Sequence, residues 1–228
     1  LPIMREYNLN CACFISGRPL AEKRATLVHK SHYVRANLAP EKFERFLYQV
    51  IEEENQSDYM NFSDEIAANH YKYDSLANAR VKYCLNYVMP PMVSEKIINV
   101  GFNQLIDSEQ EFCEQWYMSE DEIFEMNNEF NNVGSHAWTH SPLKQLSDKD
   151  SKMEIVESKR LLEKIINNDV NAISYPLGNK EAVSDREALF AKSAGYKCGF
   201  TMKREINNNL NNPFLISRFD ANDLKIAK

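Results

Sequence analysis

Apolar residues recur three or four positions apart along much of the chain, which is the spacing that lines one face of an amphipathic helix. The clearest case is residues 40–54, where a proline opens the segment and one face carries Phe43, Phe46, Leu47, Val50 and Ile51. The same spacing predicts further helices at residues 75–89, 93–106, 119–130 and 153–167. The chain is therefore expected to be rich in helix.

Short apolar runs between turn residues predict buried strands instead of helices. Such runs occur at residues 10–16, 170–175, 196–201 and 215–219. Between the second run and the third, Ser184 and Glu187 have the spacing of a capping box that opens a helix, and Gly195 ends that helix. A strand, a helix and a strand in this order predict a parallel pair of strands.

Helices that alternate with buried strands predict an α/β fold. Residues 20–112 are an exception, because they carry only helical patterns and lie between the first strand and the later ones. We therefore expect one domain, residues 1–228, with a mostly helical insertion at about residues 20–112. The insertion is interpreted as a cap that stabilises the fold, and the alternative is a lid that shapes a substrate site.

The composition argues against several classes of protein. With 228 residues and 43% hydrophobic content, the chain can bury one full core. A formal net charge of −6 without a basic stripe argues against a nucleic-acid partner. The sequence contains no apolar run of about eighteen residues, so it predicts no membrane span. Its first residues lack the layout of a secretory signal. Five cysteines without paired metal spacing predict free thiols, which favours a reducing, cytoplasmic compartment.

Metal-binding chemistry is concentrated in residues 134–141, which read Gly-Ser-His-Ala-Trp-Thr-His-Ser. His136 and His140 stand four residues apart, so their imidazoles can face one ion from a single turn or from the end of a strand. The pair lies between two predicted helices, on a short strand and its following loop, where the backbone can aim side chains into a cleft. The alternative is that two loop histidines only form hydrogen bonds.

Residues 134–141, with the helix before them and the Leu-Ser pair and helix after them, resemble the second motif of the polysaccharide deacetylases, carbohydrate esterase family four. Residues 173–178 (Ile-Ser-Tyr-Pro-Leu-Gly), a helix and residues 194–201 are similar to the third motif and the strand after it. The start of the chain is similar to the helix and strand that follow the first motif. The resemblance covers roughly residues 1–17 and 115–222, and it implies a distorted (β/α) barrel of the polysaccharide deacetylase type, incomplete at its first strand.

The resemblance implies a metal-dependent carbohydrate N-deacetylase, a hydrolase that removes the N-acetyl group of an amino sugar in a polysaccharide or its precursor. It implies that His136 and His140 hold a divalent metal, for which we expect zinc, together with an aspartate, while a second aspartate acts as base. Both aspartates belong to the first motif, which we expect upstream of Leu1. Such a metal lowers the pKa of its bound water to about 7 and polarises the acetyl carbonyl.

Several positions depart from the family pattern or allow a second interpretation. Ser174 stands where the family has an arginine that orients the base, and Arg218 is a candidate replacement, although a surface or ion-paired arginine is the simpler interpretation. Leu177 stands where the family has an aromatic residue, and its backbone N–H is expected to donate to the oxyanion. Trp138 and Tyr175 flank the site, and each is either a stacking surface for a sugar ring or part of the core.

The departures leave alternatives to catalysis open. The family's late Leu-x-x-His motif, whose histidine protonates the leaving group, has no counterpart before Lys228, so the general acid stays unassigned. The alternative function is a non-catalytic carbohydrate-binding or regulatory homologue that has lost the catalytic aspartates. In a further alternative the histidine pair is structural and only the fold is shared. Asp220 and Asp223 are weaker candidates for a third metal ligand. An incomplete first strand would expose a sheet edge, which predicts self-association or pairing with the missing part.

Overall fold

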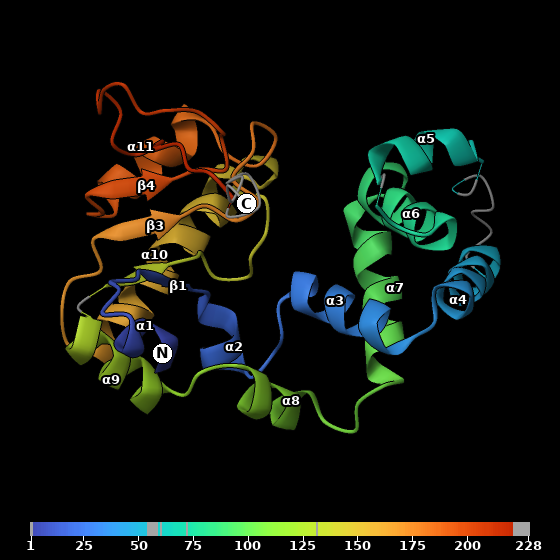
Figure 1. Ribbon diagram of the computed structural model, residues 1–228, viewed down its shortest axis with the longest axis horizontal. Coiled ribbons are helices and arrows are strands. Elements are labelled where there is room, and N and C mark those ends of the chain that lie inside the picture. Colours follow the sequence, from blue (N-terminus) through green and yellow to red (C-terminus); the bar gives the residue numbers. More distant parts are fainter. Residues whose placement is uncertain (1, 54–58, 60, 72, 131, 221–228) are drawn as a thin grey trace. The chain divides into compact units, whose positions relative to one another are not determined.

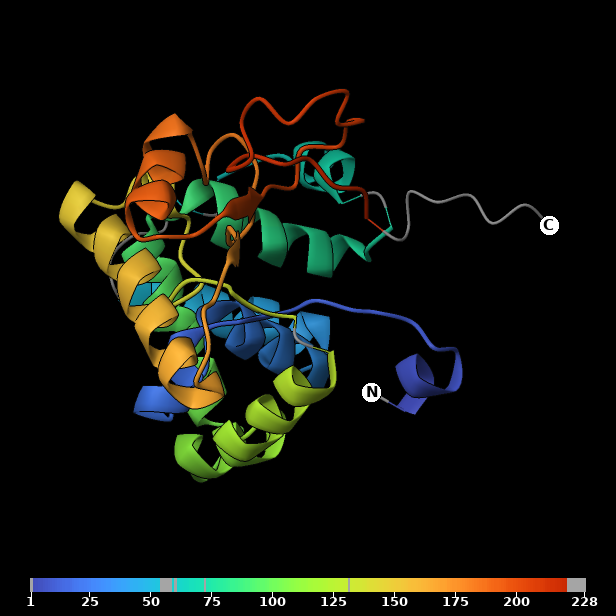
Figure 2. The ribbon, with the colours of Figure 1, turned by 90° about the vertical axis from the view of Figure 1, so that its left-hand side faces the viewer.

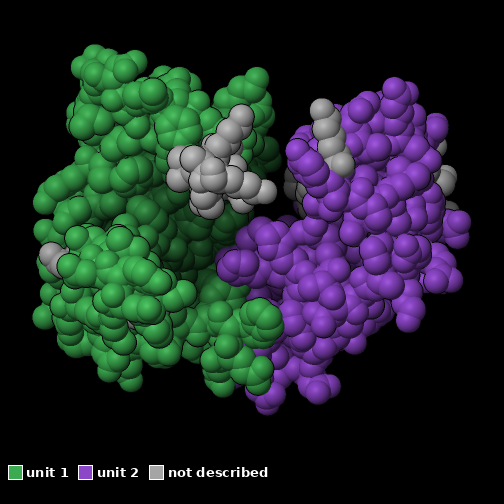
Figure 3. Space-filling model, viewed as in Figure 1, with its two compact units in different colours: residues 1–24, 113–228 green, residues 25–112 purple. Residues whose placement is uncertain are grey.

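The chain forms two compact units (Figures 1 and 3). The computed structural model describes residues 2–53, 59, 61–71, 73–130 and 132–220. The first unit consists of residues 1–24 and 113–228, and the second of residues 25–112. Within the described ranges, every strand of the sheet belongs to the first unit.

A parallel sheet of four short strands organises the first unit. In their order across the sheet, the strands are β1 (Cys13–Ile15), β2 (Val133–Ser135), β3 (Ala172–Ser174) and β4 (Cys198–Phe200). Phe14 is in register with Gly134, and Ile173 with Gly199. Because parallel strands have their carboxyl ends at one edge of the sheet, the loops that follow β2, β3 and β4 leave from the same edge.

The first unit also contains helices. They are α1 (Pro2–Glu6), α2 (Gly17–Glu22), α9 (Glu120–Phe130), α10 (Asp148–Ile166) and α11 (Asp185–Ser193). The longest of them, α10, lies beside β2 and α9 (Figures 1 and 2). Its apolar face contributes Ile155, Leu162 and Ile166 to a core that also contains Ile123 of α9 and Ile173 of β3.

The starts of the helices around the site follow local capping signals. Ser184 and Glu187 form the predicted capping box at the start of α11. Before α9, the N–H of Ser119 donates to the Glu122 carboxylate at 2.7 Å, and the N–H of Glu122 donates to Ser119 Oγ at 3.2 Å. Ser147 caps α10. These side chains bind free N–H groups of the first turn, which favours the start of a helix at each place. The start at Ser184 was predicted, whereas α10 begins at Asp148, ahead of the predicted residue 153.

The described part of the second unit is helical. Its elements are α3 (Leu27–Asn37), α4 (Pro40–Glu53), α5 (Asp64–His70), α6 (Leu76–Tyr83), the π-helical turn η2 (Cys84–Val88) and α7 (Pro91–Asn103), and α8 (Glu109–Trp116) begins in it. The predicted helices at 40–54, 75–89 and 93–106 correspond to α4, to α6 with η2, and to α7; residue 54 lies outside the described ranges. Its core is apolar and contains Phe43, Leu47, Ile51, Ile97 and Phe102.

The predicted α/β class is confirmed. The strands run in an open row from β1 to β4 in the described ranges, so closure into a barrel stays a prediction. In place of the strand predicted at 215–219, the structure has one parallel bridge, between Phe200 and Ile216. The single domain with an insertion at 20–112 and the self-association at a sheet edge also stay predictions.

A helix that crosses a bilayer needs about twenty predominantly apolar residues. No helix in the described part of the chain combines the necessary length and apolar character.

Candidate functional site

His136 directly follows β2, and a backbone hydrogen bond joins it to β1. Its N–H donates to the carbonyl of Ile15 at 2.8 Å, and Ser16 Oγ donates to its carbonyl at 3.0 Å. His140 lies four residues further along the loop, and the centroids of the two imidazole rings are 4.8 Å apart with an interplanar angle of 77°. The structure thus brings the predicted pair together at the carboxyl edge of the sheet.

A hydrogen bond determines the tautomer of His136. Its Nδ1 lies 2.5 Å from the backbone carbonyl oxygen of Ser174, the last residue of β3. A carbonyl oxygen can only accept, so Nδ1 carries the proton and Nε2 carries the lone pair of the neutral ring. Histidines that bind metals commonly donate their other ring N–H to such a carbonyl. The sequence pattern did not reveal this partner, which lies 38 residues away in the chain.

The loop between the histidines turns back on itself. Ala137 and His140 have left-handed backbone conformations, with φ angles of 59° and 69°. The carbonyl of Ala137 accepts from the N–H of Gly17 at 3.0 Å, and the carbonyl of Trp138 accepts from the N–H of Arg18 at 2.9 Å. These bonds join the loop to the first turn of α2 and account for its compact course.

Leu177 occupies a tight turn after β3. Its φ angle is 58°, its side chain is 50% exposed, and the turn is closed by a bond from the N–H of Gly178 to the carbonyl of Pro176 at 2.6 Å. The N–H of Leu177 has no acceptor among the described residues. A backbone donor without an acceptor, at the sheet edge that also carries His136, is chemically suited to bind a developing oxyanion. Its role in catalysis stays a prediction.

Tyr175 lies in the hydrophobic core. It is 0% exposed, and its hydroxyl packs against Gly199, where a Cβ atom would come within 2.6 Å of it. Burial raises its pKa, and the hydroxyl has no hydrogen-bond partner among the described residues. In this structure Tyr175 therefore takes the core role that the sequence left as an alternative, and no face of its ring is open to a sugar.

Trp138 is partly exposed, and its ring packs against helix α2. Its ring contacts Gly17, where a Cβ atom would approach Trp138 Cε3 to 2.4 Å, so this position requires glycine. The indole Nε1 donates to Glu22 at 2.7 Å. Both contacts hold the ring against α2, where stacking on a sugar stays a prediction.

Arg218 lies after the bridge to β4. Its Nε donates to the sulfur of Met202 at 3.0 Å, and its N–H donates to the carbonyl of Lys203 at 3.0 Å. Burial lowers its pKa, and the charge of Asp220 opposes that shift. Asp223 lies outside the described residues.

Imidazole nitrogens suit zinc and other transition metals, so the chemistry of the pair fits a divalent ion. The two histidines offer at most two nitrogen ligands, and a structural or catalytic zinc usually takes at least three ligands from the protein. Within the described ranges, no group of three or more His, Cys, Asp or Glu side chains could hold a metal. A metal ion held by this pair would therefore need a further donor.

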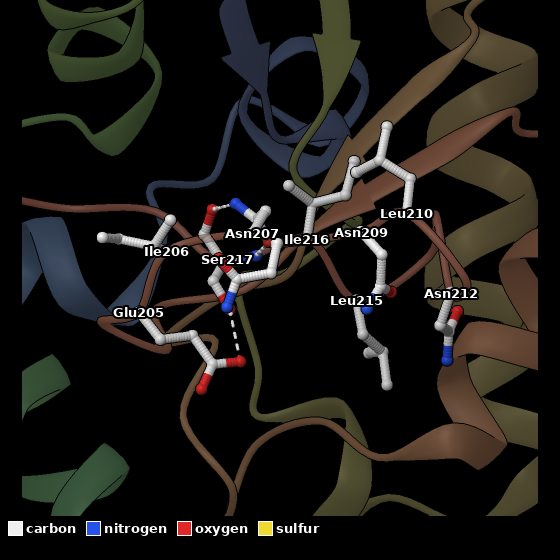
Figure 4. A pocket seen from close by; sticks show the side chains of 10 residues that line it. Glu205, Ile206, Asn207, Asn209, Leu210, Asn212, Leu215, Ile216 and Ser217 are labelled. Carbon is white, nitrogen blue, oxygen red and sulfur yellow. Dashed lines mark hydrogen bonds between the residues drawn. The ribbon is translucent and has the colours of Figure 1, made fainter.

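A polar pocket that the sequence did not predict lies beside β4 (Figure 4). It has a volume of about 450 Å³ and is lined mainly by the asparagine-rich loop at 205–212 and by residues 215–217. Asn207 exchanges two hydrogen bonds with the backbone of Ser217, at 2.8 and 3.0 Å, and Ser217 Oγ donates to Glu205 at 3.2 Å. The second unit has a pocket of about 460 Å³, lined by Asn69, His70, Tyr71, Tyr73, Asp74 and Lys82.

Comparison with known protein families finds one family that matches this chain. The family described as "Polysaccharide deacetylase" matches residues 1–199. Among curated proteins, no sequence matches this chain.

Solved structures of deacetylases are also similar to this chain. A polysaccharide deacetylase from Bacillus cereus is 28% identical, with a TM-score of 0.37, over 44% of this chain and 31% of that one. A deacetylase from Streptococcus pyogenes, solved with acetate, is 18% identical, with a TM-score of 0.42, over 80% of this chain and 83% of that one. The match to the Bacillus cereus protein thus spans about a third of that protein's length.

Proposed function

Because the chain belongs to the polysaccharide deacetylase family, we propose that it hydrolyses the N-acetyl group of an amino sugar in a polysaccharide or its precursor, with the help of a divalent metal. The observation that carries the proposal is the contact between His136 and His140, whose ring centroids are 4.8 Å apart at the carboxyl edge of the sheet. The bond from His136 Nδ1 to Ser174 supports a ligand role, because it leaves Nε2 as the atom with the lone pair.

In this proposal each residue has a defined task. His136 and His140 hold the ion, and zinc is the metal that we expect from nitrogen ligands. A bound divalent ion supplies Lewis acidity, which lowers the pKa of a bound water to about 7 and polarises a carbonyl. The carbonyl of Ser174 keeps His136 in the binding tautomer. The N–H of Leu177 donates to the acetyl oxygen as that oxygen gains negative charge.

The reaction also requires a third ligand, a base and a group that orients the base. The family resemblance assigns the first two roles to aspartates of its first motif, and we assign neither role to a described residue. Arg218 is the candidate for the third role, and it lies two residues after Ile216, which forms a parallel bridge with Phe200 of β4. Trp138 is the candidate surface for stacking on the sugar ring.

A non-catalytic carbohydrate-binding homologue is the second candidate function. Two observations favour it: no set of three metal-binding side chains occurs within the described ranges, and a serine stands at position 174 in place of the family's arginine. Under this alternative the protein binds an N-acetylated oligosaccharide and releases no acetate.

The test uses the protein as its native gene expresses it, with the variants His136→Ala and His140→Ala. Zinc content is measured by mass spectrometry of the metal, and acetate release is measured with an N-acetylglucosamine oligosaccharide. We expect about one zinc per wild-type chain, loss of that zinc in each variant, and a fall in acetate release of at least about a hundredfold.

The matched control is His32→Ala, an exposed histidine of the second unit, which should change neither quantity. Equal zinc content in wild type, His136→Ala and His140→Ala would contradict the proposal. Zinc and oligosaccharide binding without acetate release would favour the second candidate.

A further inference from the structure

A buried carboxylate lies behind the loop that joins the two histidines. Glu154 belongs to α10 and is 3% exposed. Its Oε2 accepts from the N–H groups of Trp138 at 2.9 Å and Thr139 at 2.8 Å, and its Oε1 accepts from Thr139 Oγ1 at 2.6 Å. Trp138 and Thr139 lie between His136 and His140, so one side chain of α10 binds the connecting segment through three hydrogen bonds.

The hydrogen bonds to this loop account for the burial of Glu154. Within the described ranges no lysine, arginine or histidine forms an ion pair with it. A buried carboxylate is unfavourable unless hydrogen bonds replace its lost hydration. Hydrogen bonds from N–H and O–H groups to a carboxylate are stronger than those between neutral groups, because the acceptor is ionised. The stability of the buried side chain and the conformation of the histidine loop therefore depend on each other.

The loop needs such support because its backbone is unfavourable by itself. Ala137 and His140 both have left-handed φ angles, 59° and 69°, which L-residues rarely adopt. The bonds from α2 bind the carbonyl groups of Ala137 and Trp138. The N–H groups of Trp138 and Thr139 are bound by Glu154 alone among the described residues. Without that acceptor, two N–H groups would lie without partners and the turn would lose its anchor on α10.

We infer that Glu154 is a positioning residue, which holds Trp138 and Thr139 so that His136 and His140 keep the separation needed to bind one metal ion. Glu154 acts through the loop and serves neither as a metal ligand nor as an acid or base. The inference rests on the proposed metal-binding function. It adds a residue from α10 that the sequence pattern did not single out.

The test compares two matched substitutions, Glu154→Gln and Glu187→Gln. Glu187 is also fully buried, but it lies on α11 and accepts hydrogen bonds from Ser184 and Arg186. Both changes remove a buried negative charge and keep the side-chain volume. Only the change at Glu154 weakens the bonds to the histidine loop.

Two quantities are measured for wild type and both variants. Competition with a chelating dye gives the zinc dissociation constant, and hydrogen exchange followed by NMR gives the protection of the Trp138 and Thr139 amides without metal. We expect Glu154→Gln to weaken zinc binding about tenfold and to speed exchange at both amides. We expect Glu187→Gln to change zinc binding less than about twofold, and circular dichroism checks that both variants fold.

Each outcome separates the inference from the function on which it rests. If zinc binding depends on His136 and His140 but Glu154→Gln binds zinc as tightly as Glu187→Gln does, the inference is wrong and the proposed metal site stands. If the wild type binds no zinc, both are wrong. A Glu154→Gln variant that is weakened only in zinc binding, with amide protection unchanged, also overturns the inference, because the loop would not have moved.

Discussion

The two units of the molecule bury different kinds of side chain. The buried polar residues of the first unit are Asn127, Ser135, Ser151, Glu154, Ser158, Lys159, Ser174, Glu187, Thr201 and Ser217. Those of the second unit are Thr26, Lys30 and Ser94, within the described ranges. The first unit therefore keeps polar groups inside although each requires a compensating hydrogen bond.

Three buried polar groups of the first unit bind loops and helix ends. Glu154 binds the histidine loop, and Glu187 binds the start of α11. Lys159 donates to the carbonyl of Val170 at 2.6 Å, just before β3. Backbone segments between short strands have few hydrogen bonds of their own, so side chains from the helices hold them in place. This is the construction expected of a unit that carries a precisely placed site.

The second unit is held together by aromatic packing. The ring of Phe102 contacts the rings of Tyr33 and Phe112 edge to face, with centroid distances of 5.8 and 4.9 Å. Among the described residues of the second unit, Lys30 is the buried cation, and it forms an ion pair with Glu109 at 2.8 Å. The comparison indicates that apolar packing stabilises the second unit, whereas polar bonds in the first unit also specify where its loops lie.

The largest expected effect comes from the core of the second unit. Phe102 is fully buried, so Phe102→Ala removes a large apolar side chain and leaves a cavity. We expect the free energy of unfolding of this unit to fall by about 3–5 kcal/mol, with the zinc affinity of the first unit unchanged. Hydrogen exchange resolved by peptide, measured against denaturant, reports the stability of each unit separately. A matching loss of protection in α10 would show that the two units unfold together and would break the comparison.

A smaller effect is expected at high pH from Tyr196 in the first unit. Burial raises the pKa of this phenol to about 12, and its hydroxyl donates to the carbonyl of Ile155 at 3.1 Å. The pKa of an unfolded tyrosine is about 10, so between these values the unfolded chain loses the proton first and stability falls as pH rises. At pH 11 we expect this group alone to reduce the free energy of unfolding by about 1.4 kcal/mol relative to pH 8.

Denaturant titrations of wild type and Tyr196→Phe between pH 8 and 11 check this expectation. The variant lacks one hydrogen bond and should be less stable at pH 8 by about 1 kcal/mol. Its stability should then decline less steeply with pH than that of the wild type. Identical slopes would mean that Tyr196 does not titrate in the unfolding reaction.

The smallest effect, of opposite sign, is expected at Tyr175. Its hydroxyl is buried without a hydrogen-bond partner in the described part of the chain, and such a group is unfavourable. Tyr175→Phe should therefore raise the free energy of unfolding by about 1 kcal/mol and leave zinc binding and acetate release unchanged. Denaturant titration and both site assays check this. A loss of activity at equal stability would restore Tyr175 as a substrate-binding residue.

Features that depend on neighbouring residues could be predicted from the amino-acid sequence. Helical spacing predicted α4, α7 and α10, because an apolar stripe forces a segment to cover a core. The capping box at Ser184 and Glu187 predicted where a helix begins, since its two residues are only three positions apart. The spacing of His136 and His140 predicted that their rings meet, and that separation is also local.

Features that depend on strand pairing are established only when the chain folds. The register of β2 with β3 brings the carbonyl of Ser174 to the ring of His136, and no local pattern encodes a contact 38 residues apart. Packing of α10 beside β2 buries Glu154 under the histidine loop. Placement of β3 against β4 sends the ring of Tyr175 into the core, where the sequence allowed either the core or the site. Periodicity specifies which face of a segment is buried, but the partner of each polar atom is known only when distant segments meet.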